Sequence, residues 1–316
     1  MSADSYTVTG RFAPSPTGEL HLGNLRTALV AWLAARSIGA GFVVRMEDLD
    51  RMTSSVEHER RQLADLAAIG LDWDGDVVRQ SDRFERYREA ITVLARAGLV
   101  YPCYCTRREI RREIDAAASA PHGRLPSDGY PGTCRDLTRA ERAAREAIGR
   151  PAALRLRTEH QQIEIVDLVA GVHRGMVDDV VLQRGDGVPA YNLAVVVDDA
   201  AQGVTQVVRG GDLLASTPRQ VLLQQLLGLP TPEYLHVPLV LGTDGERLAK
   251  RHGAVTLSQL AARGVTAGDV VAWLATSLEL AGPVERVGAG ELLDRFDPST
   301  VPRNPVTVTG LSTSLT

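Results

Sequence analysis

GRFAPSPTGELHLGNLRTAL, residues Gly10–Leu29, is the segment on which the fold assignment rests. Thr7–Arg11, which overlaps its start, alternates weakly and is predicted to form a short strand. Ala13–Gly18 is rich in proline and glycine and predicts a loop. Leu22–Ile38 has apolar residues at 22, 25, 29, 32 and 33, a spacing typical of a helix. With the apolar strand predicted at Phe42–Met46, these elements form one βαβ unit.

The rest of the chain continues with mixed elements and no internal repeat. Helices are predicted at Ser54–Ile69, Asp82–Ala97, Pro218–Leu227, Leu257–Ala262 and Ala267–Leu280. Strands are predicted at Val180–Leu182, Ala194–Val197, Val204–Val208 and Val237–Leu241. The tail from Gly288 to Thr316 has little periodicity and is expected to be partly disordered.

Composition limits the classes of function. The 316 residues are 44% hydrophobic, enough for a large core, and no apolar run is long enough to span a membrane. The first ten residues lack the features of a signal peptide, so a cytoplasmic location is expected. The net charge of −4 means that any RNA contact needs a local basic patch. Cys103–Arg150 offers one, with ten arginines against seven acids. The alternative is a solvated helical surface with pairs such as Arg111–Asp115 and Glu141–Arg145.

Lys250 is the only lysine, since the other 34 of the 35 basic residues are arginine. Such a bias is typical of a GC-rich genome. A lysine that persists under it is either a chance survivor or required by chemistry, because its compact charge differs from the planar guanidinium.

His21-Leu22-Gly23-Asn24 lies where the loop enters the first helix. A helix N-terminus presents unpaired N–H groups that suit a phosphate. Glycine lets a ligand approach the backbone, and histidine can donate to phosphate oxygens. A histidine at this place alone would more often be a simple cap.

All three cysteines lie between positions 103 and 134, which favours a metal site over a disulfide framework. Cys103, Cys105 and Cys134 supply three thiolates, and a tetrahedral zinc ion needs a fourth ligand. Tyr130 and His122 are the candidates for that ligand. Alternatively, the three thiols are buried and bind no metal ion.

Five segments resemble class I aminoacyl-tRNA synthetases of the glutamyl/glutaminyl branch. The opening segment resembles their HIGH region, and Arg45–Asp50 (RMEDLD) resembles their R-I-E-D-T-D segment. The runs from Tyr191 (YNLAVVVDD) and Val208 (VRGGD) resemble the third block. Arg247–Arg251 (RLAKR) resembles the KMSKS signature. The resemblance covers roughly residues 7–280 and implies a Rossmann-like parallel α/β sheet with an inserted zinc subdomain and a small helical stem-contact unit.

The resemblance also implies roles in binding glutamate. The two carboxylates and the ammonium of glutamate need cationic clamps and one anion. Arg11 would bind the side-chain carboxylate and Glu47 the ammonium. The residues expected to complete this pocket are Ala13, Ser15, Tyr191 and Arg209. Taken singly, each could instead belong to a surface ion pair.

ATP is expected at the two signature segments. His21 and Lys250 are the expected catalytic residues, and Lys250 would stabilise charge on the phosphates during adenylation. Gly23, Asn24 and Arg247 would bind ATP together with them. The chain departs from the family pattern at three places: Asn24 replaces the second histidine of HIGH, Arg247 the first lysine of KMSKS, and Ala249 its serine.

Within this branch, the resemblance is to the glutamyl-queuosine tRNA(Asp) synthetase family. Only 65 residues follow Arg251 (316 minus 251), too few for an added anticodon-binding domain. Val195 occupies a position where full-length enzymes carry asparagine. The family's C-x-C…Y-x3-C pattern implies Tyr130 as the fourth ligand of a structural zinc ion.

Four regions are predicted. Residues 1–100 and 181–250 form the two halves of the catalytic domain, residues 101–180 the insertion, and residues 251–316 the stem-contact region and tail. The expected activity is to form glutamyl-adenylate from L-glutamate and Mg-ATP and to transfer glutamate to queuosine in the anticodon stem-loop of tRNA(Asp). Alternatives are a truncated synthetase that charges a tRNA 3′ end and a non-catalytic paralogue. A monomer without membrane contact is expected.

Overall fold

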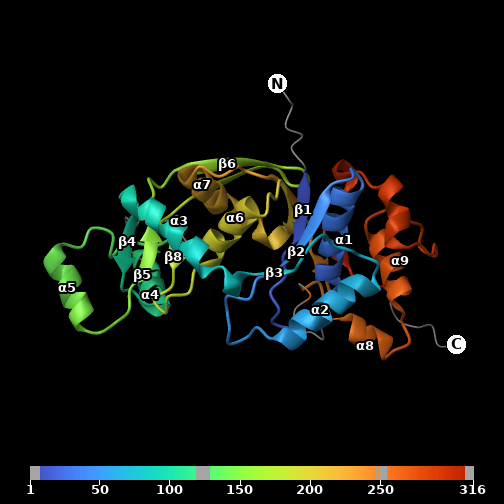
Figure 1. Cartoon of the computed structure of the whole chain (residues 1–316), viewed down its shortest axis with the longest axis horizontal. Helices are drawn as coiled ribbons and strands as arrows, with labels where there is room; N and C mark the ends of the chain where they lie inside the picture. The colour runs from blue at the N-terminus through green and yellow to red at the C-terminus, as the bar shows by residue number, and fades with distance from the viewer. Residues whose placement is uncertain (1–7, 119–128, 243, 247, 249–254, 310–316) are drawn as a thin grey trace, which may run out of the picture.

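The computed structural model describes residues 8–118, 129–242, 244–246, 248 and 255–309 (Figure 1). Lys250, Arg247, Ala249 and His122 lie outside these residues, as does the side chain of Asp115. What the sequence predicts for these positions therefore stays a prediction.

A seven-stranded sheet forms the centre of the molecule, in the order β3-β2-β1-β9-β10-β6-β7. All neighbouring strands are parallel except β6 and β7, which form an antiparallel hairpin. The strands are β1 (Thr9–Phe12), β2 (Gly41–Met46), β3 (Val78–Arg79), β6 (Gln162–Asp167), β7 (Gly171–Met176), β9 (Gln206–Gly210) and β10 (Glu233–Val237). From β1 the chain continues to β2 on one side, and from β9 it continues to β10 on the other side. The carboxyl ends of β1 and β9 therefore flank the switch point where open α/β sheets bind their ligands.

Helix α1 (Leu22–Arg36) connects β1 to β2 and is buried over most of its surface, which explains its apolar run at residues 28–35. The helix predicted at Leu22–Ile38 is confirmed, with its end two residues earlier. Four further predicted helices are also confirmed within a few residues: α2 (Val56–Ala68), α3 (Phe84–Arg96), α7 (Thr217–Leu227) and α9 (Ala267–Ser277). The strands predicted at Phe42–Met46 and Val204–Val208 correspond to β2 and β9.

The strand predicted at Ala194–Val197 is wrong. These residues lie inside helix α6 (Tyr191–Ala201), where Ala194, Val195 and Val196 are buried. They pack with residues of α3 and α7 in a second hydrophobic cluster. A run of β-branched residues favours a strand locally, but burial against two helices overrides that preference here.

A small antiparallel sheet, β4-β5-β8, lies at one end of the molecule with helices α4 and α5 (Figure 1). Its elements are β4 (Val100–Cys103), α4 (Arg107–Ala118), α5 (Arg139–Ala147), β5 (Ala153–Leu156) and β8 (Val181–Gln183). Strands β6 and β7 come from the same stretch of chain, 101–180, yet they extend the central sheet. This stretch thus contributes both to the small sheet and to the main one.

The opposite end holds the C-terminal elements (Figure 1). They are α8 (Leu257–Ala261), α9, the 3-10 turns η4 (Ala289–Arg295) and η5 (Pro298–Thr300), and strand β12 (Val306–Thr307). The expectation of disorder in this tail is wrong for residues 288–309. Leu292 is fully buried in the main core, and β12 pairs in parallel with β11 (Val240–Leu241). Long-range packing orders this segment without any local periodicity.

Candidate active site and thiol cluster

A cavity of about 770 Å³ opens at the carboxyl ends of β1 and β9. Nine residues expected from the sequence to bind glutamate or ATP line it: Arg11, Ala13, Ser15, His21, Gly23, Asn24, Glu47, Tyr191 and Arg209. Glu246 and Leu248, which flank Arg247 in the sequence, line the same cavity. Residues from five separate segments of the chain therefore meet at one place.

A buried group of charges adjoins the cavity and shares its lining residue Glu47. Arg45 Nη1 lies 2.8 Å from Asp199 Oδ1, and Arg45 Nη2 lies 3.4 Å from Glu47 Oε1. Burial opposes the charge of Arg45, but the carboxylates of Asp199 and Glu47 raise its pKa above the ordinary value. Arg45 is thus firmly charged and already paired within the protein.

Arg11 and Glu47 are less completely compensated than Arg45. Arg11 Nη1 donates to the carbonyl oxygen of Val208 across 2.7 Å, and its Nε lies 3.6 Å from Asp199 Oδ1. Burial lowers the pKa of Arg11, although Asp199 opposes this shift. Burial raises the pKa of Glu47, although Arg45 opposes it. A ligand carboxylate would therefore stabilise the charged form of Arg11, and a ligand ammonium would stabilise the charged form of Glu47.

Arg209, at the end of β9, is buried and held by side chains of neighbouring elements. Its guanidinium donates to Gln220 and Thr217 on α7 and to His236 on β10. The sequence analysis did not identify these three residues. For His236, the sequence offers one signal: it is a single histidine within the apolar run that begins at Tyr234 (YLHVPLVL).

His21 is the N-cap of α1. Its Nδ1 accepts from the backbone N–H of Asn24 across 3.2 Å, and Asn24 Oδ1 accepts from the backbone N–H of His21 at the same distance. A Cβ on Gly23 would lie 3.0 Å from Cε1 of the His21 ring, closer than side chains ordinarily approach. Glycine at this position thus leaves room for the ring, and the cap fixes how the ring lies.

The APSPTG loop is held by a residue that the sequence analysis missed. Gln62 on α2 donates through Nε2 to the carbonyl oxygens of Ser15 and Gly18, across 3.0 and 2.7 Å. Gln62 is buried and lines the cavity. A buried amide side chain therefore ties helix α2 to two carbonyl oxygens of the loop and holds the loop in place.

The three cysteines meet at the base of the small sheet, together with Tyr130. Cys103, Cys105 and Cys134 have sulfur atoms within 4.8 Å of one another. The Tyr130 hydroxyl lies 3.3 Å from the sulfur of Cys103 and 4.0 Å from that of Cys105. A zinc tetrahedron with Zn–S bonds of about 2.3 Å has edges of roughly 3.8 Å. Four donor atoms at this spacing fit a zinc ion.

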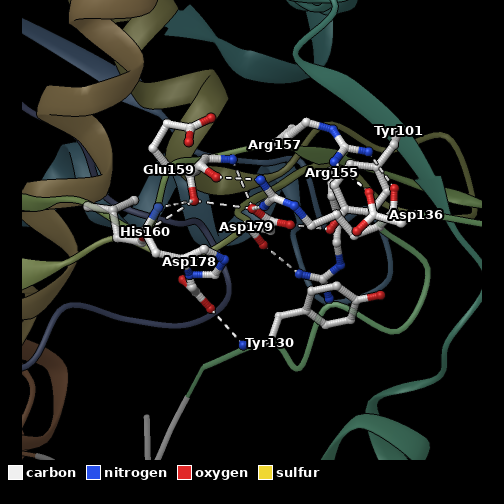
Figure 2. A network of polar contacts seen from close by, with 12 residues as sticks. Tyr101, Tyr130, Asp136, Arg155, Arg157, Glu159, His160, Asp178 and Asp179 are labelled. Carbon is white, nitrogen blue, oxygen red and sulfur yellow. Dashed lines mark hydrogen bonds and ion pairs between the residues drawn. The ribbon is translucent and has the colours of Figure 1, made fainter. Parts of the chain in front are cut away.

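The environment of the cluster supplies a positive charge. The Arg155 guanidinium lies over the Tyr130 ring, 3.8 Å from its centroid (Figure 2). Despite burial, hydrogen bonds from Tyr130 and the backbone of Cys105 hold the pKa of Cys103 below its ordinary value. Burial, together with Cys134, raises the pKa of Cys105 to about 12. One thiol is thus prepared to ionise, and the other would need a cation to do so.

A buried carboxylate, Asp179, belongs to the polar network that surrounds Tyr130 and Arg155 (Figure 2). It accepts from the Tyr101 hydroxyl and pairs with Arg135, each across 2.5 Å, and it accepts from the backbone N–H of Thr158 across 2.8 Å. Asp178 accepts from the backbone N–H of Tyr130 across 2.9 Å. Neighbouring acids thus hold both the strand and the loop that carry the donor atoms.

A second cavity, of about 720 Å³, adjoins the first. It shares Ser15, Glu47 and Tyr191 with the first cavity and extends to Cys105 at the thiol cluster. Three arginines line it: Arg107, Arg155 and Arg184. The central cavity therefore continues toward the small sheet through a region rich in positive charge.

The basic stretch Cys103–Arg150 is divided between structural and surface roles. Arg150 pairs with Glu109, and Arg135 pairs with Asp179. Other arginines are exposed: Arg107, Arg108, Arg111, Arg112 and Arg139.

Within the described ranges, none of the helices is both long and apolar enough to cross a membrane.

Comparison with known proteins places this geometry in a family. Residues 7–281 match the family "tRNA synthetases class I (E and Q), catalytic domain". The chain is 63% identical over 296 residues to a glutamyl-Q tRNA(Asp) synthetase of Nocardia farcinica, covering 94% of this chain and 91% of that protein. It is 51% identical over 312 residues to the glutamyl-Q tRNA(Asp) synthetase of Symbiobacterium thermophilum, covering 95% of each.

A solved structure supports the same assignment. The glutamate-tRNA synthetase from Elizabethkingia anophelis superposes with a TM-score of 0.82 at 26% identity, covering 96% of this chain and 68% of that one. The Rossmann-like sheet expected from the sequence is thereby confirmed. The chain belongs to the class I (E and Q) tRNA synthetase family and, within it, to the glutamyl-Q tRNA(Asp) synthetases.

Proposed function

We propose that the chain activates L-glutamate with Mg-ATP and transfers the glutamyl group to queuosine in the anticodon loop of tRNA(Asp). The observation that carries this proposal is the single cavity lined by Arg11, Glu47 and Arg209 together with His21. It combines cations and an anion suited to glutamate with a helix N-terminus suited to phosphate. The two relatives described above are named glutamyl-Q tRNA(Asp) synthetases, which agrees with this activity.

In the glutamate half of the cavity, Arg11 would bind the side-chain carboxylate and Glu47 the ammonium. Arg209 and Tyr191 would complete the pocket, with Ala13 and Ser15 along the loop. The α-carboxylate oxygen then attacks the α-phosphorus of ATP. A new P–O bond forms as the bond to pyrophosphate breaks, and glutamyl-adenylate results. Catalysis consists mostly of positioning and charge stabilisation.

In the phosphate half, His21 and the N-terminus of α1 would contact ATP, with Gly23 and Asn24 in the same turn. Arg247 and Lys250 are proposed to complete this site from the loop that follows β11. The neighbouring side chain of Leu248 is buried, and its N–H donates to the carbonyl oxygen of Val240 across 3.2 Å. This anchor supports a phosphate role for the loop at the cavity.

We propose that the second cavity receives the tRNA. It adjoins the glutamate pocket through Tyr191 and Glu47, and the positive charge of Arg107 and Arg184 suits a phosphate backbone. A hydroxyl of the queuosine cyclopentene diol would attack the carbonyl carbon of glutamyl-adenylate. The products are an ester on the modified base and AMP. ATP and tRNA are both cytoplasmic, so we propose the same location for this protein, acting as a monomer.

A structural zinc ion is proposed at Cys103, Cys105, Tyr130 and Cys134. Zinc would be held by three thiolates and one phenolate, and it would join β4 to the loop before α5. It supplies no chemistry to the reaction. Cys105, one of the four donors, lines the second cavity. The ion would therefore stabilise a wall of the proposed tRNA site.

Glutamate-dependent exchange between ATP and pyrophosphate, measured without tRNA, tests the proposal. Exchange that is lost in Lys250→Ala and in Arg209→Ala is the expected result. Glutamylation of queuosine-containing but not queuosine-free tRNA(Asp) would then identify the acceptor. Charging of queuosine-free tRNA would indicate a synthetase acting on the 3′ end. No exchange and no charging with any tRNA would indicate a non-catalytic paralogue.

A further inference from the structure

Arg209 is held in the cavity by uncharged groups. Its Nε donates to His236 Nε2 across 2.9 Å, Nη1 to Gln220 Oε1 across 2.6 Å, and Nη2 to Thr217 Oγ1 across 2.8 Å. A guanidinium has five N–H groups. These three contacts leave one N–H on each terminal nitrogen, the arrangement that binds a carboxylate in a bidentate manner.

The state of the His236 ring follows from this contact. Because Nε2 accepts from Arg209, the ring proton is on Nδ1, which donates to Asp167 Oδ2 across 2.6 Å. Asp167 also accepts from the backbone N–H groups of Val169 and Ala170, which fix its position after β6. Burial, reinforced by Arg209, lowers the pKa of His236, so the ring stays neutral despite Asp167.

Arg209 and Arg45 differ in the carboxylates that surround their guanidinium groups. Arg45 lies within 4 Å of carboxylate oxygens of Glu47, Asp198 and Asp199. Within the described part of the chain, no carboxylate forms an ion pair with Arg209. The acid nearest to it through hydrogen bonds is Asp167, which is separated from it by the His236 ring. A buried cation without a direct counter-ion retains its attraction for an incoming anion.

We propose that His236, oriented by Asp167, is a positioning residue that aims Arg209 and leaves its charge available to a carboxylate of glutamate. The neutral ring does two things. It fixes the guanidinium through Nε, and it keeps the balancing carboxylate one residue away. This inference rests on the proposed function, since it requires Arg209 to bind glutamate.

Two substitutions at His236 separate positioning from a purely structural role. His236→Gln keeps an acceptor near the position of Nε2 and loses the donor to Asp167. His236→Asn keeps a donor near the position of Nδ1 and loses the acceptor for Arg209. We expect His236→Asn to raise the glutamate KM at least about tenfold with little change in kcat, because a hydrogen bond to a charged group is lost. His236→Gln should stay within about threefold of wild type.

A structural role alone predicts the opposite order. Loss of the contact to buried Asp167 should make His236→Gln the less stable variant in thermal unfolding. If His236→Gln, the less stable variant, has the higher glutamate KM, the positioning role is overturned. The same holds if the two variants have the same glutamate KM.

A carboxylate placed directly on Arg209 tests the second part of the proposal. Gln220→Glu puts an anion at the 2.6 Å contact and should raise the glutamate KM at least about tenfold while the ATP KM changes little. Gln224→Glu is the matched control, because Gln224 is buried on the same helix and bonds to Tyr234 instead of Arg209. It should lose stability and keep the wild-type KM.

The glutamate KM of the His236, Gln220 and Gln224 variants is measured by tRNA-independent ATP–pyrophosphate exchange. Glutamate is varied, and the full chain is used. If wild type shows no glutamate-dependent exchange, the proposed function fails first. If wild type exchanges normally but Gln220→Glu matches Gln224→Glu in glutamate KM, only the positioning proposal fails. The expected result is an unchanged glutamate KM in Gln224→Glu, a glutamate KM within about threefold of wild type in His236→Gln, and a raised glutamate KM in His236→Asn and Gln220→Glu.

Discussion

Arg45 and Asp199 form a buried ion pair with 2.8 Å between Nη1 and Oδ1, and Arg11 lies 3.6 Å from the same oxygen. The pair compensates Asp199 and thereby limits its pull on Arg11. We predict that Arg45→Leu lowers the free energy of unfolding by about 3–5 kcal/mol, because it leaves a buried carboxylate underpaired. It should also raise the glutamate KM, since Arg11 then compensates Asp199. Urea unfolding and exchange kinetics measure the two effects.

Arg61→Leu serves as the control for this prediction. Arg61 forms ion pairs with Glu57 and Glu19 at the surface and is half exposed. Solvent screens such pairs, so no measurable change in unfolding is expected. Equal stability of Arg45→Leu and wild type would contradict the assigned role of the buried pair.

Gly23→Ala should impair the use of ATP. The new Cβ would lie 3.0 Å from Cε1 and 3.1 Å from Nδ1 of His21, so the ring must move by a few tenths of an ångström. Misplacement of a catalytic group by about 1 Å can cost on the order of 100-fold in rate. Since the shift here is smaller, we expect a loss of about threefold to tenfold in kcat/KM for ATP. Gly290→Ala, which meets nothing within 4 Å, should be neutral in the same exchange assay.

Glutamate binding should weaken at acid pH. Burial raises the pKa of Glu47, so its carboxylate is lost at a higher pH than that of an ordinary carboxyl group. The proposed ammonium partner requires the charged form, and the glutamate KM should therefore begin to rise, as pH falls, at a higher pH than an ordinary carboxyl group would give. Glu47→Gln should have a high KM throughout and no such rise. A wild-type KM that stays constant until ordinary carboxyl groups protonate would exclude the assigned role.

Metal analysis should find about one zinc ion per chain. Cys134→Ser should lose the ion and lower the unfolding temperature, because the cluster joins β4 to the loop before α5. Tyr130→Phe removes one ligand and should lower zinc affinity at least about tenfold, as measured by competition with a chelator. His122→Ala should leave that affinity unchanged. The reverse pattern, with His122→Ala weakened and Tyr130→Phe normal, would assign the fourth ligand to His122.

The sequence was sufficient to place those cavity-lining residues that lie within local motifs. Arg11, Ser15 and His21 fall within one twenty-residue segment, and their spacing alone indicates a strand, a loop and a helix start. Glu47 follows the next strand in the same way. Residues of this kind are predictable because their positions depend on one βαβ unit.

Residues that act through tertiary contacts could not be predicted in this way. His236 and Asp167 are 69 positions apart, and Gln62 and Ser15 are 47 apart. Nothing in either local sequence indicates the partner. Helix α6 was missed for a related reason: its valine run favours a strand until burial against α3 and α7 is considered. The order of residues 288–309 likewise depends on the core that they cover.

The position of β1 beside β9 also has a consequence during protein synthesis. Thr9 donates its backbone N–H to Thr205 Oγ1, and the two residues lie 196 positions apart. At roughly 5–20 residues per second, a ribosome needs about 10–40 s to make the intervening chain. Throughout that interval the nascent strand has one open edge, next to the residues that later form the cavity. Shielding by a chaperone that binds extended backbone would therefore matter most before residue 210 leaves the ribosome.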